Sequence, residues 1–122
     1  MTKKKLTEQE FLTLMMTAQF KRAAIVYHWG YEDDDELMKQ AGLRSANEAI
    51  EVLDSYKDGR LALVPFLDDP DPSVRVMAAG YLVKVIPERA LAVLKELDER
   101  CLTRAHMTAF WFLQRHELGT DL

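Results

Sequence analysis

Residues 61–97, LALVPFLDDPDPSVRVMAAGYLVKVIPERALAVLKEL, limit the possible folds of this chain most strongly. Their pattern predicts a short apolar helix, a turn rich in proline and aspartate, a second apolar helix and, after Pro87, a third helix. In the middle helix, predicted over residues 72–86, only Ser73, Arg75 and Lys84 interrupt the apolar residues. A helix that is apolar nearly all round must be covered on most sides. The segment therefore predicts a central helix wrapped by other helices.

Capping and helix-breaking residues divide the rest of the chain. Thr7 and Glu10 have capping-box spacing, and Gly30 is expected to close the helix that they start. Gly42 is expected to end a short second helix, and Ser45 to cap a third. The first helix is expected to bury a broad face made of Phe11, Leu14, Met15, Ala18, Ile25 and Trp29. The predicted helices cover residues 7–29, 33–41, 46–56, 61–67, 72–86, 88–100 and 103–118.

The stretch LVPFLDDPDPSVRVMAAGYL resembles a repeat of the HEAT-like helical repeat family, over a region of residues 63–97. The matching features are a proline in the first helix, an aspartate-rich turn, a Val-Arg pair, an Ala-Ala pair and a leucine: Pro65, Asp69, Asp71, Val74, Arg75, Ala78, Ala79 and Leu82. The resemblance implies that Asp69 and Arg75 are structural residues that bond to neighbouring repeats.

No stretch alternates apolar and polar residues for long enough to predict a sheet. The expected fold is therefore all-α, a compact stack of antiparallel helix pairs of the HEAT-like or α–α superhelix type, with six or seven helices. At 122 residues the chain is expected to form a single domain, residues 1–122. Residues 6–60 would supply N-terminal helices and residues 61–118 the HEAT-like pairs.

The compartment and the kind of partner follow from the distribution of cysteine, apolar residues and charge. Cys101 is the only cysteine, so no internal disulfide can form and a reducing compartment is expected. No apolar run approaches the ~20 residues of a membrane span, and no secretory signal is recognised, so we expect a cytoplasmic protein without membrane contact. The net charge is −4 and the only tight basic cluster is Lys3, Lys4 and Lys5, which makes nucleic acid an improbable partner.

Patterns of catalytic and metal-binding residues are missing from the sequence. His28, His106 and His116 lack the spacing of a metal site, and nothing around Cys101 supports a nucleophile. The aspartate-rich turn lacks the glycine and the final glutamate of a calcium loop. We therefore expect no enzyme, no metal and no cofactor.

The candidate partner-binding residues are two aromatic side chains and two groups of acidic residues. Aromatic residues next to acidic charge can anchor a protein interface, although the acidic run could equally be the solvated first turn of a helix. The candidates are Trp29, Tyr31, Glu32, Asp33, Asp34, Asp35, Glu36, Asp68, Asp69 and Asp71.

In size, charge and helical character the chain is similar to bacterial immunity proteins, which cover the basic active cleft of a cognate toxin. This similarity implies a non-catalytic immunity or inhibitor protein whose partner is another protein, with a basic toxin domain as the candidate. The alternative is a HEAT-like scaffold or adaptor subunit of a larger protein complex.

Overall fold

The computed structural model describes residues 5–100 and 105–122, and these residues form five α-helices and one 3₁₀-helix without a strand. This confirms the all-α class and the expected six or seven helices. Lys3, Lys4, Cys101 and the expected helix start at Thr103 lie outside the described residues. The elements are α1 (Glu8–Glu32), α2 (Glu36–Asp54), η1 (Gly59–Asp68), α3 (Pro72–Leu82), α4 (Pro87–Arg100) and α5 (Ala105–Glu117).

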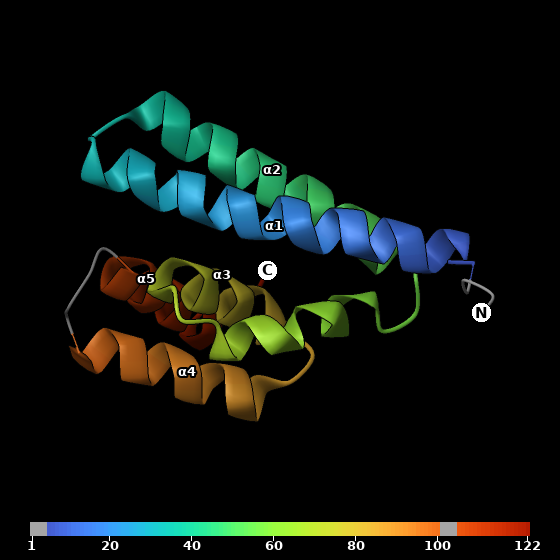
Figure 1. The fold of residues 1–122 in the computed structure, drawn as a ribbon. Helices are drawn as coiled ribbons and strands as arrows, with labels where there is room; N and C mark the ends of the chain where they lie inside the picture. The colour runs from blue at the N-terminus through green and yellow to red at the C-terminus, as the bar shows by residue number, and fades with distance from the viewer. Residues whose placement is uncertain (1–4, 101–104) are drawn as a thin grey trace.

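The helices lie in layers around α3. The antiparallel pair α1–α2 covers one side of the molecule, and η1, α3, α4 and α5 form the other part (Figure 1). Helix α3 contacts α1, η1, α4 and α5. None of the described helices is long and apolar enough to cross a bilayer.

Helix α3 is buried along almost its whole length, as its all-round apolar sequence predicts. Val74 and every residue from Val76 to Leu82 are buried. Asp71 caps the helix by accepting a hydrogen bond from Ser73 N at 2.9 Å, and Pro72 occupies the first turn, where a missing amide proton costs little. The helix ends at Leu82, earlier than the expected residue 86. Pro87 disfavours helical backbone at the preceding residue, Ile86, which favours an end of the helix before the expected residue 86.

Two predictions for the N-terminal half are wrong. The Thr7–Glu10 capping box is present, but α1 continues through Gly30 to Glu32. Gly42 does not end a helix either, because it lies in the middle of α2, which replaces the two expected helices over residues 33–41 and 46–56. A Cβ at Gly42 would lie 2.6 Å from Tyr27 N, so the absence of a side chain permits close approach of α2 to α1.

The expected buried face of α1 is also wrong in its orientation. Phe11, Leu14, Met15 and Trp29 are 49–58% exposed. The opposite side of the helix is buried instead, and its residues are Phe20, Ala23, Ala24, His28 and Gly30. The small side chains among them allow α1 to pack closely on its neighbours, which explains why the less bulky side turns inward.

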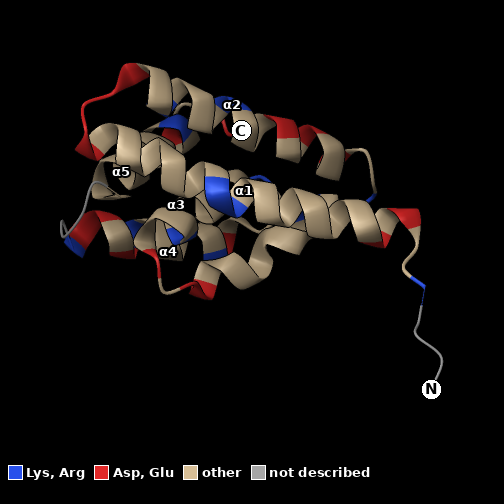
Figure 2. Ribbon diagram, turned by 45° about the horizontal axis from the view of Figure 1, so that its top comes forward, with Lys and Arg blue, Asp and Glu red and all other residues tan. Residues whose placement is uncertain are grey.

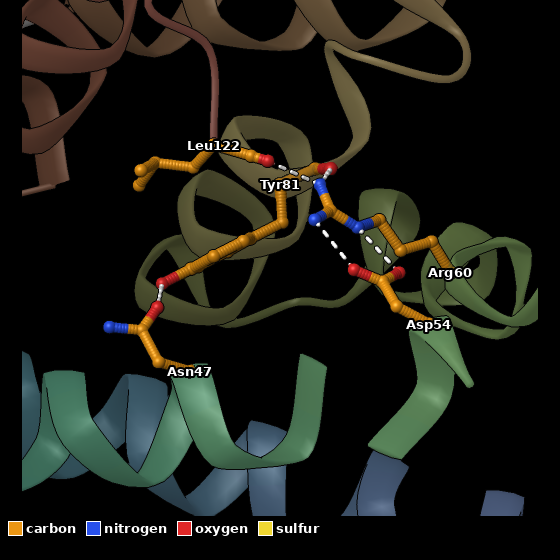
Figure 3. A network of polar contacts seen from close by, with 5 residues as sticks. All are labelled: Asn47, Asp54, Arg60, Tyr81 and Leu122. Atoms are coloured by element: carbon orange, nitrogen blue, oxygen red, sulfur yellow. Dashed lines mark hydrogen bonds and ion pairs between the residues drawn. The ribbon is translucent and has the colours of Figure 1, made fainter. Parts of the chain in front are cut away.

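Segment η1 is helical, as predicted for residues 61–67, but it is a 3₁₀-helix that contains Pro65. A polar network joins four parts of the chain, namely α2, η1, α3 and Leu122 after α5 (Figure 3). Arg60 binds both carboxylate oxygens of Asp54 at 2.9 Å and donates through Nη1 to the backbone oxygens of Tyr81 and Leu122. The Tyr81 hydroxyl in turn donates to Asn47 on α2. The network thus connects α2 and η1 to the buried helix α3.

Candidate functional site at the acidic turn

The five consecutive acidic residues form the connection between α1 and α2, which we call the acidic turn (residues 32–36; Figure 2). Glu32 is the last residue of α1, Asp33 is its C-cap, and Asp34 has a left-handed backbone with φ of 50°. Asp35 is the N-cap of α2 and accepts a hydrogen bond from Met38 N at 3.1 Å. The expected helix start at Asp33 is therefore wrong, because only the end of the acidic run serves a helix N-terminus.

The position of the charges in the acidic turn has opposite effects at its two ends. Asp35 and Glu36 lie at the positive end of the α2 dipole, whereas Glu32 and Asp33 lie at the negative end of the α1 dipole, where a carboxylate is disfavoured. All five residues are exposed. The N-terminus of α2 therefore accounts for the charges of Asp35 and Glu36, whereas the charges of Glu32 and Asp33 stabilise neither helix end.

Among the residues of the acidic turn, Glu36 forms an ion pair with Lys39 of α2. Its carboxylate lies 2.9 Å from Lys39 Nζ, and the hydrogen bond from Lys39 lowers the pKa of Glu36 below its ordinary value. Within residues 5–100 and 105–122, no ion pair includes Glu32, Asp33 or Asp34. These three carboxylates thus present concentrated negative charge to solvent.

The aromatic residues next to the acidic turn differ in how much of their surface a partner could reach. The Tyr27 hydroxyl donates to the Tyr31 hydroxyl at 3.2 Å, and burial raises the pKa of Tyr27 above its ordinary value. Lys39 Nζ lies 4.6 Å from the centre of the Tyr31 ring, so Tyr31 is engaged within the chain. Trp29 is 54% exposed. Of the two predicted aromatic residues, Trp29 is therefore the one with the larger surface available to a partner.

An open hollow beside the acidic turn is too small for a typical small-molecule ligand. It has a volume of about 130 Å³ and is lined by Tyr27, Tyr31, Glu36, Lys39, Gln40 and Leu43. Ligand pockets usually have volumes of about 300–1,000 Å³. The described residues also contain no cluster of three or more histidine, cysteine, aspartate or glutamate side chains that could hold a metal ion.

The three other predicted acidic residues lie at the end of η1 and in the turn that joins it to α3, and each has a partner within the chain. Asp68 pairs with Arg89 at 2.8 Å, and Asp69 pairs with Lys21 on α1 at 3.0 Å. Asp71 caps α3. Burial acts to raise the pKa of Asp69, but hydrogen bonds from Asp71 N and Lys21 outweigh it and lower the pKa below its ordinary value. Asp69, whose side chain is 9% exposed, is therefore less available for a partner than the residues of the acidic turn, whereas Asp68 stays exposed beside Arg89.

Arg75 acts within the same turn. Its guanidinium Nη1 donates to the backbone oxygens of Asp69 at 2.8 Å and Pro70 at 3.2 Å. These bonds hold the turn against the start of α3. The ion pair between Asp69 and Lys21 links this turn to α1, and the pair between Asp68 and Arg89 links it to α4.

A buried polar contact that the sequence did not indicate joins α1 to α5. His28 is 3% exposed, and its Nδ1 lies 2.9 Å from the Ala24 oxygen while its Nε2 lies 3.0 Å from Thr108 Oγ1. Because a carbonyl oxygen can only accept, Nδ1 carries the proton and Nε2 accepts from the Thr108 hydroxyl. Thr108 is 80 residues away in the chain, so no local pattern could have revealed the pair.

The neutral state of His28 makes stability depend on pH. Burial lowers the pKa of His28 below 6.5, so the unfolded chain binds a proton more readily than the folded chain. The free energy of unfolding should therefore fall as pH decreases from 6.5 towards 5, by at most about 1.4 kcal/mol per pH unit from this group. Urea unfolding at several pH values measures the slope. His28→Leu should reduce the slope, and an unchanged slope in this variant would contradict the assignment.

Comparisons of the chain with protein-family models, with curated proteins and with solved structures find no match. The function must therefore be inferred from the charges, exposure and contacts of the chain itself.

Proposed function

We propose that this protein is a non-catalytic protein-binding module, an immunity or inhibitor protein that neutralises a cognate bacterial toxin by occluding its active site. The observation that carries the proposal is the acidic turn, in which Glu32, Asp33 and Asp34 are exposed and take part in no ion pair among the described residues. A toxin that acts on nucleic acid binds phosphate with clustered lysine and arginine. Carboxylates gathered on one rigid turn are complementary to such a cleft.

Three physical effects support a role of the acidic turn in binding. Concentrated charge of one sign speeds the encounter with a partner of opposite sign and excludes partners of the same sign. Exposed Trp29, three residues before the turn, can add affinity because burial of a tryptophan often dominates an interface. The hydrogen bonds of Asp33 and Asp35 with the helix ends hold the turn in place, which limits the entropy lost on binding.

Neutralising the acidic turn should slow association with the partner. The triple variant Asp33→Asn, Asp34→Asn and Asp35→Asn should lower the association rate constant about 10-fold at low salt and weaken its salt dependence. The third substitution should preserve the cap of α2, because asparagine and aspartate are comparable N-caps. The measurement is stopped-flow binding at several ionic strengths, with the partner identified by copurification from the native cell and mass spectrometry.

A matched control removes the same charge elsewhere. Glu88→Gln, Glu96→Gln and Glu99→Gln change three exposed residues of α4 and should leave the salt dependence much closer to that of the wild type. Equal kinetics for the wild type and the acidic-turn variant would rule out this acidic turn as the binding surface.

The alternative function, a HEAT-like scaffold or adaptor subunit, is favoured by a different observation. Phe11, Leu14 and Met15 on α1 are about half exposed, which offers an apolar surface independent of the acidic turn. Gene neighbourhood distinguishes the two proposals, because an immunity gene should directly follow the gene of its toxin. An adaptor needs no such neighbour.

A further inference from the structure

The outward side of α1 carries residues spaced alternately by three and four positions, which is the pattern of a coiled-coil seam. Six of these residues are exposed and Ile25 is half-buried. We call this set the outer stripe. It consists of Glu8, Phe11, Met15, Ala18, Arg22, Ile25 and Trp29.

The middle of the outer stripe lacks charge. Between Glu10 and Lys21 the helix contains no charged residue, and Leu14, which flanks the stripe, is 58% exposed. Phe11 and Met15 are 53% and 49% exposed. An apolar strip of this kind on a helix gains free energy when another helix covers it.

The two charged residues of the outer stripe select one arrangement of that second helix. Glu8 and Arg22 lie two heptads apart, about 21 Å along the helix. If two copies of α1 packed in parallel, glutamate would face glutamate and arginine would face arginine. In antiparallel packing, the glutamate end of each helix meets the arginine end of the other. The charges therefore favour an antiparallel pair of identical helices.

We propose that a second copy of this chain covers the outer stripe from Glu8 to Ile25, and that the two α1 helices pack antiparallel about a two-fold axis between Met16 and Thr17. In this register Met15 packs on Ala18 of the second copy, which places a large side chain opposite a small one. Phe11 then lies beside Arg22 of the second copy, in reach of a cation–π contact. Glu8 lies within one helical turn of the same arginine. Each of these contacts occurs twice by symmetry.

The extent of this contact predicts a reversible dimer. The helices overlap from Glu8 to Ile25, about 27 Å, which we expect to bury on the order of 1,000 Å² in total. This area lies at the lower limit of specific interfaces, so a dissociation constant in the micromolar range is expected. Trp29 and the acidic turn lie beyond the overlap, and the proposed partner surface stays open in the dimer.

The test is the mass of the protein in solution as a function of concentration, measured by sedimentation equilibrium. The wild type should approach twice the 14.0 kDa mass of one chain at high micromolar concentration. Met15→Glu should raise the dimer dissociation constant about 100-fold or more. The two introduced glutamates, one from each copy, would be buried close together near the two-fold axis. Leu37→Glu on α2, at a residue that is 80% exposed and lies off the stripe, is the matched control and should leave the dimer intact.

A charge exchange tests the register. Glu8→Arg alone should weaken the dimer, and the double variant Glu8→Arg with Arg22→Glu should restore it, because the opposite charges meet again with reversed sign. Both residues are exposed, so the folded monomer should tolerate the changes, and circular dichroism checks this. A wild type that stays at the mass of one chain overturns the proposal. So does a dimer that Met15→Glu leaves unchanged, or a double variant as weak as the single one.

Discussion

Replacing Gly42 by valine should lower the free energy of unfolding by about 3 kcal/mol, although valine is a better helix former than glycine. A Cβ at this position would lie 2.6 Å from Tyr27 N, 2.8 Å from Tyr27 Cα and 2.9 Å from Ala23 O. All three atoms belong to the backbone of α1 and cannot move aside without shifting the helix. The α1–α2 pair would have to separate, which would also disturb the packing around Ala46 and Ala49. Urea denaturation followed by circular dichroism measures the loss.

Asparagine at the same position distinguishes the two roles that a glycine can have in a helix. If Gly42 closed a helix in the left-handed conformation, Gly42→Asn would be tolerated, because asparagine adopts that conformation readily. If Gly42 permits close approach, Gly42→Asn should be as destabilising as valine. Ala41→Val, at the exposed neighbouring residue, is the control and should change stability by less than about 1 kcal/mol. Wild-type stability of Gly42→Asn would contradict the close approach.

Local signals in the sequence were sufficient for the elements whose causes are local. The Thr7–Glu10 capping box and the Asp71–Pro72 start of α3 depend on residues within a few positions, and both are present. The burial of α3 follows from its own composition, because a helix apolar on all sides has no side to expose. The role of Gly42 could not be predicted from its neighbours in the sequence. Its role depends on Tyr27, which belongs to another helix.

The orientation of α1 shows a second limit of sequence analysis. Its bulky residues form a broad apolar face, and hydrophobicity alone predicts that this face is buried. The structure buries the opposite side, where Ala23 and Ala24 permit close packing, and Phe20 fills the centre against Tyr81 with ring centres 5.5 Å apart. Periodicity thus identified one apolar face and did not show that the opposite side meets the rest of the chain.

The candidate site was predictable as a set of residues but not as an arrangement. Five consecutive acidic residues are visible in the sequence, whereas their division between two helix ends depends on where α1 ends. In the sequence, Asp68 and Asp69 are candidate partner-binding residues on the same grounds as the residues of the acidic turn. Their partners Arg89 and Lys21 lie 21 and 48 residues away in sequence, so only the folded chain shows that their charges are paired.

Arg60→Met should lower the free energy of unfolding by about 2–3 kcal/mol. The side chain of Arg60 is 11% exposed in its pair with Asp54, and its guanidinium is a donor to the backbone oxygens of Tyr81 and Leu122 (Figure 3). Methionine keeps the apolar stem of arginine but leaves these oxygens without that donor and Asp54 without its partner. Thermal and urea unfolding measure the loss.

Two further variants separate the shape of the guanidinium from its charge. Arg60→Lys keeps the positive charge but cannot bind both oxygens of Asp54 and a backbone oxygen at once, so it should recover less than half of the loss. Arg89→Met is the control, because Arg89 also pairs with an aspartate, Asp68. That pair is exposed, so the variant should lower the free energy of unfolding by about 0.5 kcal/mol or less. If Arg60→Met were as stable as Arg89→Met, the contacts of Arg60 would contribute little. If Arg60→Lys matched the wild type, charge alone would account for the effect, and the fork of hydrogen bonds between α2, η1 and α3 would be dispensable.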